Sequence, residues 1–390
     1  MRVLVDVRHL GSPTQSGVGE YTIQLLKALF RIRGHEYLLF SSGSQTPPLP
    51  QFFPEIQDLP NVRHIHISIQ NKMLNASFLL ANRPSVRDLV GVEADLLFAP
   101  NLAIFPLPLS IPTILTVHDA TWSLFPDLYS WKMRLWHKAV RPVRLLTQAK
   151  TIICPSQSTA SDMKNTFGIP TNRLMVIPHG INHERFTSET PSQKNLDISV
   201  RIKYRLPERF LLFLGTLEPR KNIRMLLEAV LAYRKQSGDD IRLVLAGASG
   251  WRNADVRNML LMPEISPWVS HIQYVPSSDR PALYRSATAF VWPTLYEGFG
   301  LPVLEAMACG TPVITSAISS IPEVTGSAAL LVNPYLSSDL TEAIRQILTS
   351  EALRKRLHDE GLKRASIFSW VTAAEKTLET FERTLHPETK

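Results

Sequence analysis

The sequence predicts an α/β protein made of two doubly wound units, each a parallel sheet covered by helices. Short β-branched and apolar runs alternate with segments of helical period along most of the chain, which is the pattern of strand–helix–strand crossovers. The alternation stops in a polar stretch over residues 182–206, which we expect to be the interdomain linker, and then restarts. The length of 390 residues allows two domains that each bury a core.

The first half is expected to contain seven strands with helices between them. One helix, over residues 19–31, closes at Gly34, and another, over residues 156–167, opens at the capping residue Ser156. The predicted strands cover residues 2–7, 37–40, 62–67, 95–99, 113–117, 151–154 and 174–177.

The second half repeats the pattern and then changes. From residue 337 to about residue 385 the segments are helical, with no strand between them. Ligands of doubly wound sheets lie at the carboxyl ends of the strands, so we expect the site in a cleft between two such units that face each other. The predicted strands cover residues 210–215, 241–246, 272–275, 289–291, 312–315 and 329–332.

Composition narrows the class of protein. No apolar run is long enough to span a bilayer, and Asp6 interrupts the apolar N-terminus too early for a signal peptide. The two cysteines, Cys154 and Cys309, lie far apart without a CxxC pattern, so neither a disulfide framework nor a zinc site is indicated. We therefore expect a cytoplasmic protein and leave peripheral association with the inner membrane open.

The formal net charge of +8 indicates an anionic partner. No zinc-finger or RNP-type signature and no dense basic block with interleaved aromatics is present, so nucleic acid is not expected. Residues 131–146 predict a basic amphipathic helix, with five Lys and Arg among tryptophans and leucines. Such a helix either contacts anionic lipid or packs its apolar stripe on its own domain, and both interpretations stay open.

Two features of the first half lie at predicted strand ends. Residues 11–19 form a glycine-containing loop before the first helix, where backbone N–H groups can approach an anion. The loop is too long for a dinucleotide fingerprint, and the third glycine is missing. His118 and Asp119 follow the predicted strand over residues 113–117, a position at which polar side chains can meet a substrate.

The next feature is the turn after the predicted strand over residues 210–215. Pro219 marks the turn, and Arg220 and Lys221 stand at the entrance of a helix that begins near Asn222. Cations at a helix N-terminus oppose the helix dipole, so their presence favours a shared anion such as phosphate. Solvated surface cations are the alternative.

The strongest feature runs from Glu297 to Gly310. Gly298 and Gly300 flank a loop that opens a helix at about Leu301. The backbone N–H groups of residues 299–301 are then placed to bind phosphate or sugar oxygens. Glu297 in the loop and Glu305 inside the helix can each accept two hydrogen bonds, which suits the vicinal hydroxyls of a sugar. The sequence therefore predicts a nucleotide-sugar site.

These residues carry a specific resemblance. Glu297 and Glu305, with seven residues between them, match the E-x7-E motif of the family-4 retaining glycosyltransferases, which have the GT-B fold. The similarity spans essentially the whole chain and is greatest to bacterial enzymes that build surface polysaccharides as mannosyl- or glucosyltransferases. It implies an acceptor-side domain over residues 1–185, a donor-binding domain over residues 186–369, and a C-terminal helix over residues 370–390 that crosses back to the first domain.

The resemblance also implies roles for individual residues. The catalytic group would be His118, Asp119 and Glu297, with His118 near the reacting centre of the donor sugar and Asp119 supporting it or facing the acceptor. One position departs from the family: Thr216 stands where many members have arginine, which places more of the diphosphate charge on Lys221 and Arg220. The remaining assignments are the diphosphate at Gly17, Arg220, Lys221, Gly300 and Leu301, the donor hexose at Glu297, Gly298 and Phe299, the ribose at Glu305, and the base near Gly247 and Val275.

The implied reaction transfers a hexose from UDP-glucose, GDP-mannose or a related donor to a saccharide or a lipid-linked saccharide. A DxD motif is absent, so the chain's own cations, rather than a metal, are expected to stabilise the leaving diphosphate, and no cofactor is expected. A non-catalytic nucleotide-sugar-binding partner in an assembly complex, or another GT-B activity such as an epimerase, remains the alternative. The sequence leaves the base, the hexose, the acceptor and the oligomeric state open.

Overall fold

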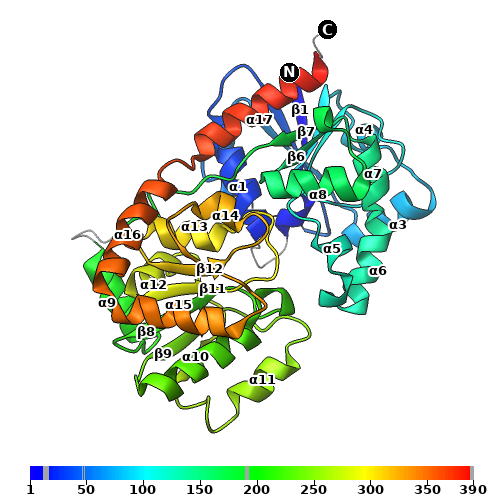
Figure 1. The fold of residues 1–390 in the computed structure, drawn as a ribbon. Coiled ribbons are helices and arrows are strands. Elements are labelled where there is room, and N and C mark those ends of the chain that lie inside the picture. Colours follow the sequence, from blue (N-terminus) through cyan, green and yellow to red (C-terminus); the bar gives the residue numbers. More distant parts are fainter. Residues whose placement is uncertain (12–16, 46, 48, 189–192, 387–390) are drawn as a thin grey trace. The chain divides into compact units, whose positions relative to one another are not determined.

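The computed structural model describes residues 1–11, 17–45, 47, 49–188 and 193–386. Contacts divide the chain into two compact units. Unit 1 comprises Met1–Trp122, Trp131–Gly180 and Ser369–Lys390, and unit 2 comprises Ser123–Ser130 and Ile181–Phe368. Each is a parallel sheet with helices on it, as Figure 1 shows, which confirms the predicted α/β class.

The sheet of unit 1 has the order β3-β2-β1-β4-β5-β6-β7, with every neighbouring pair parallel. The two inner strands on either side of β1 align Leu4 with Leu38 and Leu97, and all three are buried. All seven predicted strands are confirmed within two residues at each end. The strands are β1 (Arg2–Asp6), β2 (Glu36–Ser42), β3 (Val62–Ile67), β4 (Leu96–Ala99), β5 (Thr113–Thr116), β6 (Thr151–Cys154) and β7 (Leu174–Val176).

The helices of unit 1 begin and end where the local sequence predicts. Ser156 accepts a hydrogen bond from the Thr159 N–H (3.1 Å) at the start of α8, and Gly168 ends that helix with a φ of +66°. These helices are α1 (Gly17–Phe30), α3 (Asn71–Leu80), α4 (Val86–Val90), α6 (Trp131–Val140), α7 (Pro142–Gln148), α8 (Gln157–Phe167) and α17 (Trp370–Leu385), with the single turn α2 (Leu49–Phe52).

The predicted helix over residues 131–146 is in fact two helices. Arg141, between α6 and α7, has a φ of +53°. Pro142 is the cause, because proline disfavours the helical conformation in the residue before it and has no N–H to continue the ladder.

The C-terminal helix completes the core of unit 1. Trp370, Ala374 and Phe381 of α17 are buried with Val3 of β1 and Leu26 of α1. Figure 1 shows α17, in red, beside α1 in blue, although the two are at opposite ends of the chain. The last helix is thus an integral part of the first unit.

The sheet of unit 2 has the order β10-β9-β8-β11-β12-β13 and is also parallel throughout. One prediction is wrong in position: β10 covers Val269–Ile272 and not residues 272–275. Its neighbour β9 ends at Ala246, and Gly247 then turns away with a φ of +141°, so the register between the two strands ends at the pair of Ala246 and Ile272. The other strands are β8 (Phe210–Leu214), β9 (Arg242–Ala246), β11 (Ala289–Trp292), β12 (Val313–Ser316) and β13 (Leu330–Val332).

The helices of unit 2 correct the predicted linker. Part of that polar stretch forms α9 (Lys194–Lys203), which buries Val200 and joins α12 through an ion pair between Asp197 and Arg285 (2.5 Å). Because α9 is held by paired charges rather than by a wide apolar stripe, its sequence lacks the apolar pattern of a helix. This is why the segment was predicted to be a linker. The other helices are α10 (Ile223–Ser237), α11 (Ala254–Leu260), α12 (Arg280–Ser286), α13 (Leu301–Ala308), α14 (Ile321–Thr325), α15 (Ser337–Thr349) and α16 (Glu351–Ala365), with the single turn α5 (Thr121–Leu124) at the boundary of the units.

A short segment belongs to unit 2 although unit 1 flanks it in the sequence. In Ser123–Ser130, the Tyr129 ring stacks on Trp251 with the centroids 6.0 Å apart. The Trp251 Nε1–H donates to the Leu128 carbonyl (2.7 Å). The chain therefore enters unit 2 twice.

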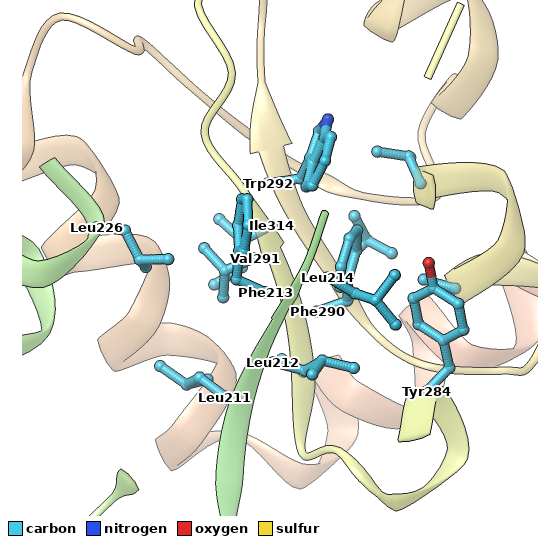
Figure 2. Close-up of a cluster of buried hydrophobic side chains, with 14 of the residues drawn as sticks. Leu211, Leu212, Phe213, Leu214, Leu226, Tyr284, Phe290, Val291, Trp292 and Ile314 are labelled. Carbon is cyan, nitrogen blue, oxygen red and sulfur yellow. The ribbon is translucent and has the colours of Figure 1, made fainter. Parts of the chain in front are cut away.

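Aromatic rings fill the core of unit 2 below the sheet's carboxyl edge. Phe213 of β8 stacks on Trp292 of β11 (4.9 Å between centroids), and Phe290 lies beside Trp292 (5.7 Å). Figure 2 shows these rings with the indole nitrogen of Trp292 at the edge of the cluster, pointing away from the apolar side chains. The indole N–H is thereby placed to donate to Glu297, which follows in the next loop.

No helix in the described parts of the chain is both long and apolar enough to cross a bilayer. Over the same residues, no group of three or more His, Cys, Asp and Glu is arranged to hold a metal ion.

Candidate donor site and the residues around His118

The predicted loop-to-helix junction after β11 is present. Helix α13 begins at Leu301, as predicted, with Pro302 in its first turn. Gly300 precedes it with a φ of +105°, and a Cβ at this residue would lie 2.7 Å from Cδ1 of Ile321. The left-handed conformation favours glycine at this position, and a larger residue would in addition displace the end of the Ile321 side chain.

The Glu297 carboxylate is buried and surrounded by donors. Oε1 accepts from Lys221 Nζ (2.5 Å), Trp292 Nε1 (3.1 Å) and the Thr294 hydroxyl (3.0 Å), and Oε2 accepts from Arg220 Nη1 (2.8 Å). Three predicted site residues thus meet, together with two that were not predicted. The carboxylate has a defined orientation because both of its oxygens are engaged.

Arg220 is held from several sides. Its guanidinium donates to the Tyr296 carbonyl (3.0 Å) and to Oε1 of Glu218 (2.8 Å). Its own carbonyl accepts from the Leu295 N–H (2.8 Å), and the Thr294 hydroxyl lies 3.1 Å from it. The turn before α10 and the loop before α13 are therefore joined by both backbone and side chains.

Glu218, Arg220, Lys221 and Glu297 form an ion cluster in which the number of positive and negative charges is equal. Glu218, Lys221 and Glu297 are buried, and Arg220 is mostly so. Burial alone would raise the pKa of Glu297, but the charges of Arg220 and Lys221 and their hydrogen bonds outweigh it and hold that pKa at about 2. Burial and the nearby Arg220 lower the pKa of Lys221, while Glu297 opposes that shift. Two cations and two carboxylates therefore stand in contact with little access to water.

Trp292 forms one wall of the ion cluster. Lys221 Nζ lies 4.4 Å from the centroid of the Trp292 ring, while the indole N–H binds Glu297. A Cβ on Gly215 would lie 2.7 Å from the Trp292 ring, so glycine at the end of β8 makes room for the indole. One side chain thus contacts both members of the Lys221–Glu297 ion pair.

Two serines anchor the loop backbone. The Glu297 N–H donates to Oγ of Ser319 (3.0 Å). The Ser320 hydroxyl lies within hydrogen-bond distance of the Glu297 carbonyl (2.9 Å) and the Phe299 carbonyl (3.0 Å). Ser319 has a φ of +51°, a conformation that is uncommon outside glycine. The position of residues 297–299 is therefore set by the segment after β12.

Glu305 lies on α13 and is also buried. Its Oε2 accepts from the Tyr284 hydroxyl (2.8 Å). Burial first, and then the neighbouring Glu305 carboxylate, raise the pKa of Tyr284 well above its ordinary value. The tyrosine therefore stays a hydrogen-bond donor to Glu305 at any physiological pH.

Gly247 and Val275 lie at the ends of neighbouring strands. A Cβ on Gly247 would meet the Gly215 carbonyl oxygen at 2.1 Å, so the loops after β8 and β9 touch through their backbones. Val275 is buried beyond the end of β10. Both lie at the carboxyl edge of the sheet, on the opposite side of β8 from the loop at Glu297.

In unit 1, His118 follows β5, as predicted. Its Nε2 lies 2.8 Å from the Pro100 carbonyl. A carbonyl only accepts, so Nε2 carries the proton in this hydrogen bond and Nδ1 is the basic nitrogen. Burial lowers the pKa of His118, and the Pro100 carbonyl and Asp119 only partly offset it. Asp119 accepts from the Thr121 N–H (2.9 Å), which places one of its oxygens on the backbone of the following turn.

His118 belongs to a cluster of rings that the sequence does not reveal. The Tyr21 centroid lies 4.8 Å from that of His118 and 4.6 Å from that of His179. His179 in turn stacks on Trp370 of α17 (5.9 Å). Gly17 opens α1, the helix that carries Tyr21, while residues 12–16 of the predicted anion loop lie outside the described residues.

Several residues of the candidate donor site were missed from the sequence. Glu218 precedes the predicted Arg220 by two positions, and Trp292 ends the strand before the predicted loop, so closeness to the motif would have found both. Tyr284 and Ser319 offer no such signal, because they reach the site from α12 and from the segment after β12.

Comparison with known proteins agrees with the fold and the motif. Residues 198–364 match the family model for glycosyl transferases group 1, and residues 15–185 match the model for glycosyltransferase family 4. The chain is 30% identical to the O-antigen chain mannosyltransferase B of Escherichia coli over 374 residues, which covers 94% of this chain and 96% of that protein. The chain therefore belongs to the glycosyltransferase family that these two models describe.

Solved structures share the fold at low sequence identity. The sucrose-phosphate synthase of Thermosynechococcus elongatus superposes with a TM-score of 0.74 at 21% identity, covering 99% of this chain and 100% of that one. Anabaena HepE in complex with UDP-glucose gives a TM-score of 0.72 at 18% identity, covering 98% and 99%. The GT-B class expected from the sequence is thus confirmed.

Proposed function

We propose that the protein is a retaining hexosyltransferase that uses a nucleotide sugar to extend a saccharide or a lipid-linked saccharide in envelope or exopolysaccharide biosynthesis. The observation that carries the proposal is the buried cluster of Glu297, Lys221 and Arg220 at the start of α13. Mannose from GDP-mannose is our first choice of donor, since the relative aligned along nearly the whole chain is a mannosyltransferase. Glucose from UDP-glucose is the second.

The ion cluster suggests how a donor is received. The two cations are already compensated by Glu218 and Glu297, so an entering diphosphate takes over Lys221 and Arg220. Glu297, released from those cations, then accepts hydrogen bonds from the hexose hydroxyls. Glu305, oriented by Tyr284, accepts from the ribose. After the exchange the diphosphate is the partner of the two cations, and Glu297 keeps hydrogen-bond donors in Trp292, Thr294 and the hexose hydroxyls.

The reaction then follows the development of charge. The bond between the anomeric carbon and the diphosphate oxygen breaks as the acceptor oxygen forms its bond on the same face. The acceptor proton passes to the departing phosphate, and the nucleoside diphosphate leaves. Lys221 and Arg220 stabilise the growing negative charge, a contribution of about 3 kcal/mol per preorganised donor. In this proposal no metal takes part.

A panel of UDP- and GDP-hexoses with purified protein tests the proposal. We expect hydrolysis or transfer with one donor, retention of the anomeric configuration by NMR, and an unchanged rate in EDTA. Glu297→Gln should abolish transfer while the nucleoside diphosphate still binds. A protein that binds a nucleotide sugar without turnover would instead be the non-catalytic partner, and conversion of the donor hexose without transfer would indicate an epimerase.

A further inference from the structure

The segment Ser123–Ser130 belongs to unit 2 and contacts the donor-site loops at two points, and we call it the strap. At the first contact, the centroid of the Phe125 ring lies 5.5 Å from that of Tyr296. Tyr296 is buried and directly precedes Glu297, and its carbonyl accepts from Arg220 Nη1 (3.0 Å). One end of the strap therefore packs on the residue whose backbone helps to hold Arg220 in the ion cluster.

The second contact is with the loop after β9. The Tyr129 ring stacks on that of Trp251 at an interplanar angle of 13°, and the Trp251 indole N–H donates to the Leu128 carbonyl (2.7 Å). Trp251 lies in the loop that begins at Gly247, one of the two positions that the resemblance assigned to the base. The other end of the strap therefore rests on the loop expected near the nucleotide base.

The strap has a defined shape between its two contacts. Residues 126–128 form a single 3-10 turn with Pro126 at its first position. The Leu128 N–H donates to the Phe125 carbonyl (3.0 Å), and the Tyr129 N–H donates to the Pro126 carbonyl (3.1 Å). Proline fixes one backbone angle, and the two hydrogen bonds close the turn. The separation between Phe125 and Tyr129 is therefore set by the backbone.

The strap completes a ring of contacts among three loops at the carboxyl edge of the sheet, in which β8 lies between β9 and β11. The loops after β8 and β9 are bound to each other, because the Leu217 N–H donates to the Ala248 carbonyl (3.0 Å) and the Gly250 N–H donates to the Leu217 carbonyl (3.0 Å). The loops after β8 and β11 are joined by the hydrogen bond from the Leu295 N–H to the Arg220 carbonyl (2.8 Å). The strap joins the two outer loops directly, so they cannot move apart without breaking one of its contacts.

We propose that the strap is a positioning element of the donor site, which keeps the loop near the base and the loop near the hexose at the spacing of one intact nucleotide sugar. The inference rests on the proposed function for the identity of this ligand. A ligand held at both ends gains affinity from loops that are already correctly spaced, whereas a ligand that uses only one end does not. Phe125, Tyr129 and Trp251 are then positioning residues, and none of them needs to touch the donor.

The first test is calorimetry on the full chain with GDP-mannose and UDP-glucose, and with GMP and UMP, which lack the hexose. Phe125→Ala removes one contact of the strap. Trp251→Phe keeps a ring for Tyr129 but removes the N–H that binds the Leu128 carbonyl. Each variant should weaken binding of the intact donor about 2- to 10-fold and leave the affinity for the monophosphate nearly unchanged.

Two control variants match these changes. Leu124→Ala shortens an exposed apolar side chain of the strap next to Phe125. Trp268→Phe removes an indole N–H that donates to the Glu264 carbonyl (2.6 Å), a contact outside the strap. Both controls should bind the donor and the monophosphate like the parent protein. Equal losses for the two ligands in Phe125→Ala and Trp251→Phe, or equal losses in the controls, would overturn the proposal.

Hydrogen exchange without ligand tests the strap independently of any reaction. In Phe125→Ala and in Trp251→Phe, the backbone amides of residues 247–251 and 294–297 should both lose protection, while those of α16 keep theirs. Unchanged exchange, or a loss confined to the one loop that lost its contact, would mean that the strap does not fix the spacing. A parent protein that binds none of the four ligands would refute the proposed function, while the exchange result would still decide whether the strap holds the two loops together.

Discussion

At the scale of single residues, the indole N–H of Trp292 is the contact with the sharpest consequence. It donates to Glu297, the carboxylate proposed to bind the hexose, while the diphosphate is assigned to Lys221 and Arg220. Trp292→Phe keeps an aromatic ring under Lys221 but removes this donor. A hydrogen bond to a charged group contributes about 1.5–3 kcal/mol, so kcat/KM should fall about 10- to 100-fold.

Because Glu297 is proposed to bind the hexose and Lys221 and Arg220 the diphosphate, the effect of Trp292 can be measured with two ligands. In Trp292→Phe the affinity for the nucleoside diphosphate alone should be unchanged, while the affinity for the intact nucleotide sugar falls, both measured by calorimetry. Trp268→Phe is the matched control, because Trp268 is also buried and donates to a backbone carbonyl outside the ion cluster. Equal losses for both ligands would mean that Trp292 only maintains the fold.

The depressed pKa of Glu297 predicts an acid-sensitive contribution to stability. Its pKa is lowered from 4.5 to about 2, so the folded state favours the ionised form, and the stabilisation is present above pH 4.5 and lost as the pH falls toward 2. The shift corresponds to about 3 kcal/mol. In urea titrations between pH 5 and pH 2.5, Glu297→Gln should lose less of its unfolding free energy than the parent protein.

The exposed Glu208→Gln is the control for that measurement. It should follow the parent protein through the whole pH range. If Glu297→Gln also follows the parent protein, the carboxylate is not held ionised by Lys221 and Arg220 in solution.

At the scale of elements, the loops at the carboxyl edge of unit 2 depend on the absence of a Cβ. Gly247 combines a φ of +141° with a backbone contact, whereas Gly238 at the end of α10 has a φ of +71° and open space around it. Gly238→Ala should cost about 1 kcal/mol from the left-handed conformation alone. Gly247→Ala should cost clearly more and weaken nucleotide binding as well, since β8 and β9 must move apart.

Thermal unfolding with and without nucleoside diphosphate separates the two effects. Similar destabilisation in both alanine variants would show that the backbone contact at Gly247 relaxes easily. A loss of ligand stabilisation in Gly247→Ala alone would support the predicted place of this loop near the base.

Elements were easier to predict than contacts. Strand and helix positions follow from local patterns, because apolar periodicity, Ser156 and Gly168 act within a few residues. Local patterns failed where residues far away in the sequence stabilise an element. The α9 segment was predicted to be a linker because its helix is held by an ion pair with Arg285, 88 positions from Asp197. The Lys221–Glu297 ion pair joins residues 76 apart. The family resemblance assigned both residues to the donor site but did not predict that they touch, and periodicity alone predicts neither. The hydrogen bond from Trp292 to Glu297 could not be predicted either, because it depends on how β11 packs beside β8.

At the scale of the whole molecule, unit 1 depends on its last helix. Phe381 of α17 is fully buried, with its ring centroid 5.1 Å from that of Phe98 on β4. Phe381→Ala should lower the unfolding free energy by about 3–5 kcal/mol through the cavity it leaves. Hydrogen exchange should show that the backbone amides of unit 1 lose protection first, while those of β8–β13 stay protected.

The control for α17 is Glu379→Ala, an exposed position on the same helix. It should leave both exchange and stability nearly unchanged. Equal loss of protection in both units after Phe381→Ala would mean that the two unfold as one cooperative block.

The return of the chain to unit 1 at Ser369 also orders events during synthesis. Unit 2 ends at Phe368, so all of its strands and helices have been translated before α17 exists. Unit 1 has its seven strands by Val176 yet lacks Trp370 and Phe381 until α17 has been translated. At about 5–20 residues per second, the ribosome holds this nearly finished sheet with an uncovered face for on the order of ten seconds or more. A chain that stops before Trp370 would therefore leave the unit that was made first without the helix that completes its core.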